Sequence, residues 1–395
     1  MNSLYVHIPF CASKCPYCDF YSVAPRFPLG ASHRPPKGGI LTKQEQFVTC
    51  CVEILQLQEN TWRTAYIGGG TPSVLAPALL ARLLAAIECE GEFTIECIPT
   101  SITPEFCRVI AQSGANRVSM GVQSAVPSER KALGRSGGLD EITQALALLN
   151  AEGMKNLSLD VMLGIPGQSI ESLTETLAFC AKYAKHISAY LLKIEPGTPF
   201  AAHPPEKLPD EDAQAELYLH ACEWLEAHGF AQYEISNFAM PGYESQHNLN
   251  YWRCGEYFAI GPAAHGFTQR RRWHYERDLA AFLRGDAPID DGPGGDFEER
   301  AMLALRLNEG FQSPSARMLE QAEKLPGLVE VISTPPLACG HLPQGGDLGN
   351  LSKAAVAARA SPLGEMPRSD RGGSTIKLTR EGFLLSNMII GRLLG

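Results

Sequence analysis

Hydrophobic and polar positions alternate along the first half of the chain in two periods, which predict strands and helices in turn. Short apolar runs are typical of buried strands, whereas apolar residues that recur every three or four positions predict amphipathic helices. The predicted strands are Leu4–Ile8, Ala65–Ile67, Phe93–Glu96, Arg117–Val122, Leu157–Met162 and Ile187–Leu192. The predicted helices between them are Lys43–Gln58, Pro77–Ile87, Pro104–Gln112, Glu141–Glu152 and Ile170–Lys182.

Strands that alternate with helices predict a parallel sheet covered by helices, and therefore an α/β fold. Six such units suit a partial (β/α)6 barrel of the TIM type, which is an open barrel rather than a closed one. In barrels of this type, ligands bind at the carboxyl ends of the strands. Residues 22–39 are rich in proline, glycine and basic side chains, and we expect a loop there.

The second half of the chain has a different pattern. We expect an amphipathic helix at Asp210–His228, a compact aromatic segment after it, a helix at Phe297–Asn308, and a closing turn and helix at 377–394. Residues 332–375 are rich in Ala, Gly, Pro and Ser, and this composition predicts a mobile insertion. We therefore divide the chain into a barrel domain, 1–200, and a smaller α+β domain, 201–395.

Three cysteines follow the first predicted strand in a C-x3-C-x2-C array, at Cys11, Cys15 and Cys18. Three thiolates so close together can bind three irons of a 4Fe-4S cluster and leave the fourth iron without a protein ligand. One alternative is a zinc site, which needs a fourth ligand nearby, and His7 is the candidate within this stretch. The other alternative is three unrelated buried thiols.

Polar or glycine-rich positions also follow several predicted strands. The second strand leads into GGGTP at 68–72, the third ends at Glu96, the fourth is followed by Gln123, and the fifth contains Asp160. Each could be an ordinary hydrogen-bonded group at the surface. Their recurrence at the same end of successive strands favours a ligand site, because barrel sites are built on that rim.

The cysteine array, with Tyr5 before it and CPYCDF at its end, resembles the radical SAM superfamily and, within it, the coproporphyrinogen oxidase-like family. The resemblance implies a 4Fe-4S cluster held by the three cysteines, with S-adenosylmethionine (SAM) bound beside it. It also implies a set of positions that hold SAM, namely Tyr5, Gly69, Gly70, Thr71, Glu96, Gln123, Arg135 and Asp160.

The sequence HNLNYW at 247–252 resembles a signature of the haem-chaperone branch of this family. This resemblance implies haem binding, with His247 as the candidate iron ligand and delivery of haem to acceptor proteins. Histidine commonly ligates haem iron, and aromatic side chains can pack on a porphyrin. The alternative interpretation of the segment is a cluster of core residues.

Two other functions compete with a haem chaperone. The first is an oxygen-independent coproporphyrinogen III oxidase, which decarboxylates two propionates by radical chemistry. Against it, Phe20 stands where that enzyme has a fourth cysteine, and the chain begins at the first strand without the enzyme's N-terminal extension. The second is a cluster-bearing interaction module that does not use SAM. Whether the protein is an enzyme stays open at this point.

Composition excludes some partners. The net charge of −9 argues against nucleic-acid binding, because no strongly basic face is available for phosphates. No run approaches the roughly 20 apolar residues of a membrane span. With no apolar signal segment before Leu4, we expect reduced thiols and a cytoplasmic protein. Peripheral membrane association and a homodimer stay open.

Overall fold

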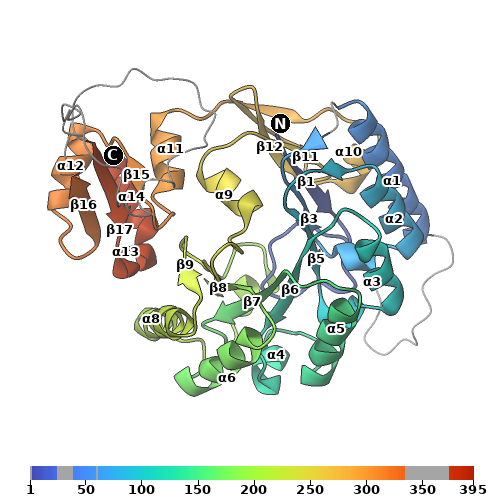
Figure 1. Ribbon diagram of the computed structural model, residues 1–395, viewed down its shortest axis with the longest axis horizontal. Helices are drawn as coiled ribbons and strands as arrows, with labels where there is room; N and C mark the ends of the chain where they lie inside the picture. The colour runs from blue at the N-terminus through green and yellow to red at the C-terminus, as the bar shows by residue number, and fades with distance from the viewer. Residues whose placement is uncertain (1, 25–38, 59–60, 334–372) are drawn as a thin grey trace, which may run out of the picture.

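A computed structural model describes residues 2–24, 39–58, 61–333 and 373–395 (Figure 1). Its centre is a run of six neighbouring parallel strands in the order β1-β3-β5-β6-β7-β8. Their bounds are β1 Ser3–Ile8, β3 Ala65–Gly69, β5 Phe93–Cys97, β6 Arg117–Gln123, β7 Leu157–Leu163 and β8 His186–Leu191. These are the six predicted strands, so the partial barrel is confirmed.

Burial explains why these strands form the centre of the fold. Every residue of β6 is buried, and β1 and β7 have one partly exposed residue each. Parallel strands covered on both faces need such nearly continuous apolar runs. One hydrophobic core extends from these strands to the helices around them.

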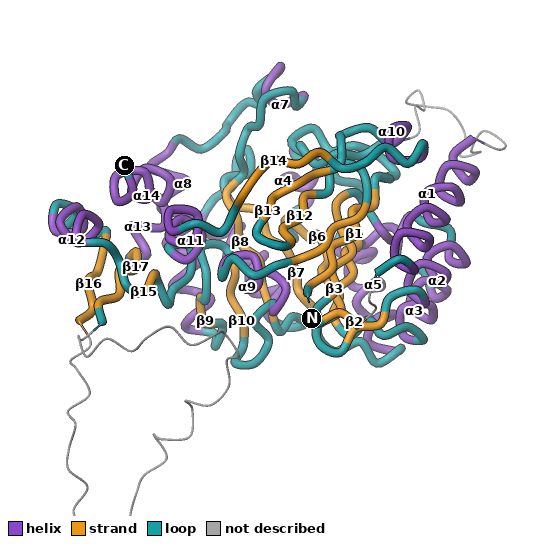
Figure 2. The backbone as a smooth tube through the Cα atoms, turned by 90° about the horizontal axis from the view of Figure 1, so that it is seen from above, coloured by secondary structure: helices purple, strands orange, loops and turns teal. Residues whose placement is uncertain are grey.

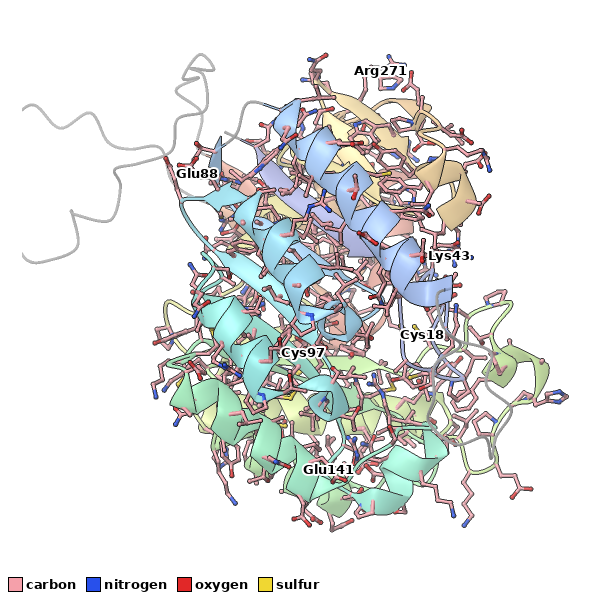
Figure 3. All side chains as sticks on the ribbon, turned by 90° about the vertical axis from the view of Figure 1, so that its right-hand side faces the viewer. Cys18, Lys43, Glu88, Cys97, Glu141 and Arg271 are labelled. Atoms are coloured by element: carbon pink, nitrogen blue, oxygen red, sulfur yellow. The ribbon has the colours of Figure 1, made fainter. Side chains whose placement is uncertain are left out.

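Five predicted helices cover the outer face of the sheet (Figures 1 and 3). They are α1 Gly39–Gln56, α2 Pro77–Ala85, α3 Pro104–Ala111, α5 Leu139–Ala151 and α6 Ile170–Ala181. A short helix, α4 Pro127–Ala132, was not predicted, and neither were the 3-10 turns Pro72–Val74 and Pro99–Ser101 or the paired strands β2 Thr61–Trp62 and β4 Glu88–Cys89. The helix predicted to begin at Lys43 begins four residues earlier, at Gly39.

Residues beyond 200 extend the same sheet at both edges, which the sequence pattern did not reveal. On one side, β11 Tyr257–Ile260 pairs in parallel with β1 and is followed by β12 His265–Thr268, β13 Arg271–His274 and β14 Ile289–Pro293. On the other, β10 Asn237–Ala239 pairs with β8 and with β9 Ala231–Gln232. Figure 2 shows β12, β13 and β14 side by side. The first strand thus lies inside the sheet.

The remaining elements include a second, three-stranded sheet in the order β15-β17-β16. Its strands are β15 Phe311–Gln312, β16 Val329–Ser333 and β17 Ser374–Leu378. The helices of this half are α7 Pro199–Ala202, α8 Glu211–Ala227, α9 Gln246–Trp252, α10 Leu279–Leu283, α11 Phe297–Ala304, α12 Ala316–Glu323, α13 Arg380–Leu384 and α14 Ser386–Leu394. The closing stretch is therefore a strand and two helices, not the predicted turn and single helix.

Two predictions concern the division of the chain. Most of the predicted insertion at 332–375 lies outside the described residues, and its two ends pair as neighbours, with Ile332 opposite Thr375. The boundary at residue 200 stays a prediction, although the later strands join the first sheet. Among the described residues, no helix is both long and apolar enough to span a membrane.

Candidate functional site

A cavity of about 600 Å³ lies at the carboxyl ends of the central strands. The loop after β1 and the ends of β3, β5, β6, β7 and β8 all line it. Figure 3 labels two of the lining residues, Cys18 from that loop and Cys97 from the end of β5. Ten of the twelve residues that the sequence singles out line the cavity: Cys11, Cys15, Cys18, Gly69, Gly70, Thr71, Glu96, Gln123, Arg135 and Asp160.

Backbone hydrogen bonds anchor the cysteine loop at its two ends. The Cys11 amide donates to the Val23 carbonyl at 3.1 Å, and the Val23 amide donates to the Pro9 carbonyl at 2.8 Å. Phe10 is buried between them and packs edge-on against Phe47 of α1, with ring centroids 5.6 Å apart. The loop therefore has a fixed base while its tip faces the cavity.

The three thiols are free, half-buried and close to one another. Burial raises the pKa of the Cys18 thiol, and the neighbouring Cys15 and Cys11 thiols raise it further. Such crowding disfavours three thiolates without a cation, and a bound iron cluster would supply the missing positive charge. The donor set therefore fits a cluster with three protein ligands.

His7 does not fit the zinc alternative. Its Nδ1 is 2.9 Å from the Tyr5 hydroxyl and its Nε2 is 2.8 Å from the Tyr21 carbonyl oxygen, so both ring nitrogens have partners. Burial lowers the pKa of His7 to about 4 and keeps the ring neutral. The ring packs under Gly69, where an added Cβ would lie 2.4 Å from it. His7 supports the glycine turn and does not join the cysteines.

The glycine turn after β3 fits closely between β1 and the end of β5. A Cβ on Gly70 would lie 2.5 Å from the Phe10 carbonyl oxygen, and Gly69 adopts a left-handed φ of +96°. The Thr71 hydroxyl reaches the cysteine loop, 3.4 Å from the Cys11 sulfur. Only glycines allow the two strands to approach in this way.

Glu96 lies at the end of β5 with two hydrogen bonds to its carboxylate. The Tyr66 hydroxyl donates at 2.6 Å and the Gly69 amide donates at 3.1 Å. Burial raises the pKa of Glu96 to about 7, and the nearby Asp160 carboxylate also raises it. Burial likewise raises the pKa of Asp160, which accepts a hydrogen bond from Ser119 at 3.1 Å. Two carboxylates in one cavity make it suited to a cationic ligand.

The side chains of Gln123 and Arg135 both lie next to Gly121. A Cβ on Gly121 would lie 3.0 Å from the Gln123 amide nitrogen and 3.5 Å from the Arg135 guanidinium. Gln123 has a left-handed φ of 68° at an irregularity between β6 and β7, which turns its side chain to the Tyr190 hydroxyl at 3.1 Å. Arg135 donates to the Tyr17 hydroxyl at 2.9 Å. Tyr17 thereby joins the cysteine loop to the strand ends.

The other two singled-out residues lie outside the cavity. The Tyr5 side chain bonds His7 behind the glycine turn. His247 is fully buried, with Nδ1 2.8 Å from the Thr64 hydroxyl and Nε2 2.8 Å from the Tyr251 hydroxyl. Burial lowers the pKa of His247 to about 3. In this conformation neither ring nitrogen is free to ligate iron.

Several cavity residues escaped the sequence analysis: Tyr17, Tyr66, Lys193 and Asn248. Tyr17 stands inside the C-x2-C spacing, which was a usable signal. Asn248 follows His247 in α9, and adjacent residues on a helix point about 100° apart. The HNLNYW segment thus turns its asparagine to the cavity and its histidine to the core.

Glu92 holds α9 in this place. Its carboxylate accepts from the Ser245 hydroxyl at 2.9 Å and from the amides of Gln246 at 3.0 Å and His247 at 3.1 Å. Arg117, which lines the cavity, lies 3.9 Å from the same carboxylate. A negative charge at a helix N-terminus is stabilising, so Glu92 and Arg117 connect α9 to the strands.

Comparisons with known proteins agree with this geometry. The family model described as "Radical SAM superfamily" matches residues 5–180. Heme chaperone HemW of Escherichia coli K12 is 38% identical over 67% of this chain and 69% of its own. Heme chaperone HemW of Lactococcus lactis is 33% identical over 78% of this chain and 82% of its own. The solved structure of coproporphyrinogen III oxidase (HemN) from Escherichia coli covers 99% of this chain and 89% of its own, with TM-score 0.73 and 19% identity, and it supports the fold.

Proposed function

We propose that this chain, which belongs to the HemW family of radical SAM proteins, is a haem chaperone of the cytoplasm. It binds haem and passes it to acceptor proteins. The observation that carries the proposal is the agreement with relatives named heme chaperones over about two thirds or more of both chains. Delivery of haem to acceptor proteins, formation of a homodimer and peripheral association with a membrane stay predictions.

The cavity would hold two cofactors. Cys11, Cys15 and Cys18 would bind the 4Fe-4S cluster, and the glycine turn with Glu96 and Asp160 would bind SAM beside it. When bound, the cluster supplies one electron to the SAM sulfonium. The side chains of this chain bind and orient: the carboxylates accept from hydroxyl and ammonium groups, and Arg135 can pair with a carboxylate. Tyr5 would support this site through His7 rather than contact SAM directly.

An oxygen-independent coproporphyrinogen III oxidase is the second candidate. The likeness to HemN favours it only at the level of the fold, since the identity is 19%. Phe20 lines the cavity, is 66% exposed, and stands at the position where the oxidase has a further cysteine. A phenyl ring cannot donate a thiol hydrogen or ligate a metal, and it offers an apolar face instead.

Paired assays on the cluster-loaded protein test the proposed function. Haem is titrated by absorbance, and coproporphyrinogen III is incubated anaerobically with SAM and a reductant. We expect a saturable haem spectrum and no porphyrinogen turnover above a no-enzyme control. Steady decarboxylation of the porphyrinogen would refute the chaperone proposal and leave the oxidase.

A change at Tyr251 tests whether His247 is the haem ligand. Tyr251→Phe keeps the ring and removes the hydroxyl that occupies His247 Nε2 at 2.8 Å. If His247 ligates iron, it must first give up this hydrogen bond, which is worth about 1 kcal/mol. We therefore expect haem affinity to rise several-fold in Tyr251→Phe and the Soret band to shift in His247→Ala, both measured by titration.

His228→Ala is the matched control, because His228 is exposed at the C-terminal end of α8 and its Nδ1 bonds the Trp224 carbonyl of the same helix. His247→Ala is also expected to lower the free energy of unfolding by about 2 kcal/mol, since Thr64 and Tyr251 lose a buried partner. A haem spectrum that stays the same in both Tyr251→Phe and His247→Ala would exclude His247 as the ligand.

The raised pKa of Glu96 predicts pH-dependent SAM binding. The ionised carboxylate attracts the SAM cation, and with a pKa of about 7 only half of the Glu96 carboxyl groups are ionised at pH 7. In the folded protein without ligand, the raised pKa makes ionisation unfavourable, so this group lowers stability as the pH rises from 4.5 toward 7. A bound cation relieves that cost. We expect SAM affinity to fall about tenfold between pH 8 and pH 6, measured by equilibrium binding.

Glu96→Gln is the control for this pH effect. The amide keeps a similar shape and an oxygen that can accept from Tyr66, but it does not ionise between pH 6 and pH 8. Its SAM affinity should be lower at pH 8 and nearly independent of pH. An unchanged pH profile in Glu96→Gln would assign the titration to another group in the cavity, for which Asp160 is the first candidate.

A further inference from the structure

Two histidines and an aspartate gather on the three strands at one end of the large sheet. His265 is in β12, His274 is in β13 and Asp291 is in β14, which are the neighbouring strands in Figure 2. One ligand atom from each residue lies within 4.8 Å of the other two. None of the three lines the cysteine cavity.

Strand pairing places the two imidazoles on one face. His265 and His274 are directly opposite in the antiparallel ladder, and their rings stack at 5.1 Å between centroids with 23° between planes. Stacked rings that both carried a proton charge would repel each other. The stacked pair is therefore suited to hold at least one neutral imidazole, the form that ligates metals.

A β-bulge brings the carboxylate to the same place. In the pairing of β13 with β14, Arg272 faces Gly292 and Trp273 faces Asp290, so Asp291 has no cross-strand partner. Bulges redirect a side chain from the regular alternation. Here both oxygens of Asp291 lie 2.9 Å from Nδ1 of His274, which donates to them.

Two arginines nearby carry positive charge that would oppose a cation, but each has a carboxylate partner. Arg272 lies 2.8 Å from Glu299, and Arg277 lies 3.2 Å from Asp19. Asp291 itself adds a negative charge next to His274. Counting these partners, the surroundings of the three residues are close to neutral, and an ion is not strongly repelled.

We propose that His265, His274 and Asp291 bind one divalent transition-metal ion of the zinc type. Two imidazole nitrogens and one carboxylate oxygen form a ligand set that zinc uses, with bonds of about 2.0–2.2 Å. Tetrahedral ligands at that distance are about 3.3 Å apart. The present spacing brackets this value: Nδ1 of His274 lies 2.9 Å from the Asp291 oxygens, and all three ligand atoms lie within 4.8 Å of one another. Three protein ligands leave a position open for water or an outside ligand.

This site is independent of the proposed haem function, so its test needs neither haem nor SAM. Cluster-loaded protein is titrated anaerobically with zinc chloride in a calorimeter, because the cluster then occupies the three cavity thiols. We expect one zinc ion per chain at this site. His265→Ala and His274→Ala should each weaken binding about tenfold or more, since even groups that only orient a ligand contribute this much.

Asp291→Asn tests the carboxylate with little change of shape, and His203→Ala is the control, as His203 is an exposed histidine elsewhere. Zinc should raise the melting temperature of the wild type and of His203→Ala, and not that of His265→Ala or His274→Ala. Metal-free melting curves show whether the variants fold. If all variants bind zinc equally, the metal is assigned to thiols and the site is overturned. A loss of zinc binding in His203→Ala equal to that in His265→Ala or His274→Ala would also overturn it.

Discussion

Replacing Cys11, Cys15 and Cys18 together by alanine is expected to remove all cluster iron from the reconstituted protein. The wild type should carry about four irons per chain with absorption typical of a cubane cluster, and the triple variant close to none. The physical reason is that, among the described residues, Cys97 is the one further cysteine that lines the same cavity, and it is buried in β5. Iron analysis and absorbance after anaerobic reconstitution give the measurement.

The matched control replaces three other half-buried thiols, Cys50, Cys89 and Cys254, which do not line the cavity. This control should keep its full iron content, so a general loss of thiols cannot explain the result. The fold should survive in the triple variant, because its cysteines lie in a loop rather than in the core. About four irons retained in the triple variant would show that the assigned ligands are wrong.

A second large effect is expected from Gly70→Ala. The added Cβ would lie 2.5 Å from the Phe10 carbonyl oxygen and 2.6 Å from that of Ile8, and both are backbone atoms that cannot rotate away. Relief requires β1 and the glycine turn to separate, which also strains the bond from the Gly70 amide to the Ile8 carbonyl at 2.7 Å. Overpacking of this kind costs about 1–3 kcal/mol, and we expect the upper end.

Urea unfolding of Gly70→Ala measures that cost, and reconstitution shows whether the cysteine loop still binds iron. Gly391→Ala is the control, because a Cβ there meets nothing within 4 Å and the residue lies in α14. Its stability should be unchanged or slightly higher, since alanine favours a helix. If Gly70→Ala unfolds at the same urea concentration as the wild type, the strands are less tightly joined than the distances indicate.

The central strands could be predicted from the sequence because they are buried on both faces. The run 157–163 is apolar at five of its seven positions, and its strand was found to within one residue. Elements that bury polar side chains could not be predicted in the same way. Helix α4 has the sequence PSERKA, with no apolar period, yet Arg130 within it is buried and donates to the carbonyls of Ser136 and Gly137. Hydrogen bonds of this kind leave no hydrophobic pattern.

Pairing between strands that lie far apart in the sequence could not be predicted either. Strand β11 has only four residues and pairs with β1 across about 250 positions of sequence, and no local signal encodes such a partner. At the site, motif spacing placed the cavity residues but not the direction of each side chain. His247 and Asn248 are adjacent in the sequence, and only the packing of α9 against Thr64 and Glu92 decides which one reaches the cavity.

The position of β1 between β3 and β11 has a consequence for biosynthesis. Asp19 and Tyr21, just after the cysteines, bond Arg277 and Leu279, each across 258 positions of sequence. At about 5–20 residues per second, a ribosome needs roughly 10–50 s to make that stretch. During this time the nascent chain has its three thiols but lacks the residues that bond Asp19 and Tyr21 beside them. Cluster insertion into a finished site must therefore wait until Arg277 and Leu279 have been translated, and the emerging thiols are open to oxidation until then.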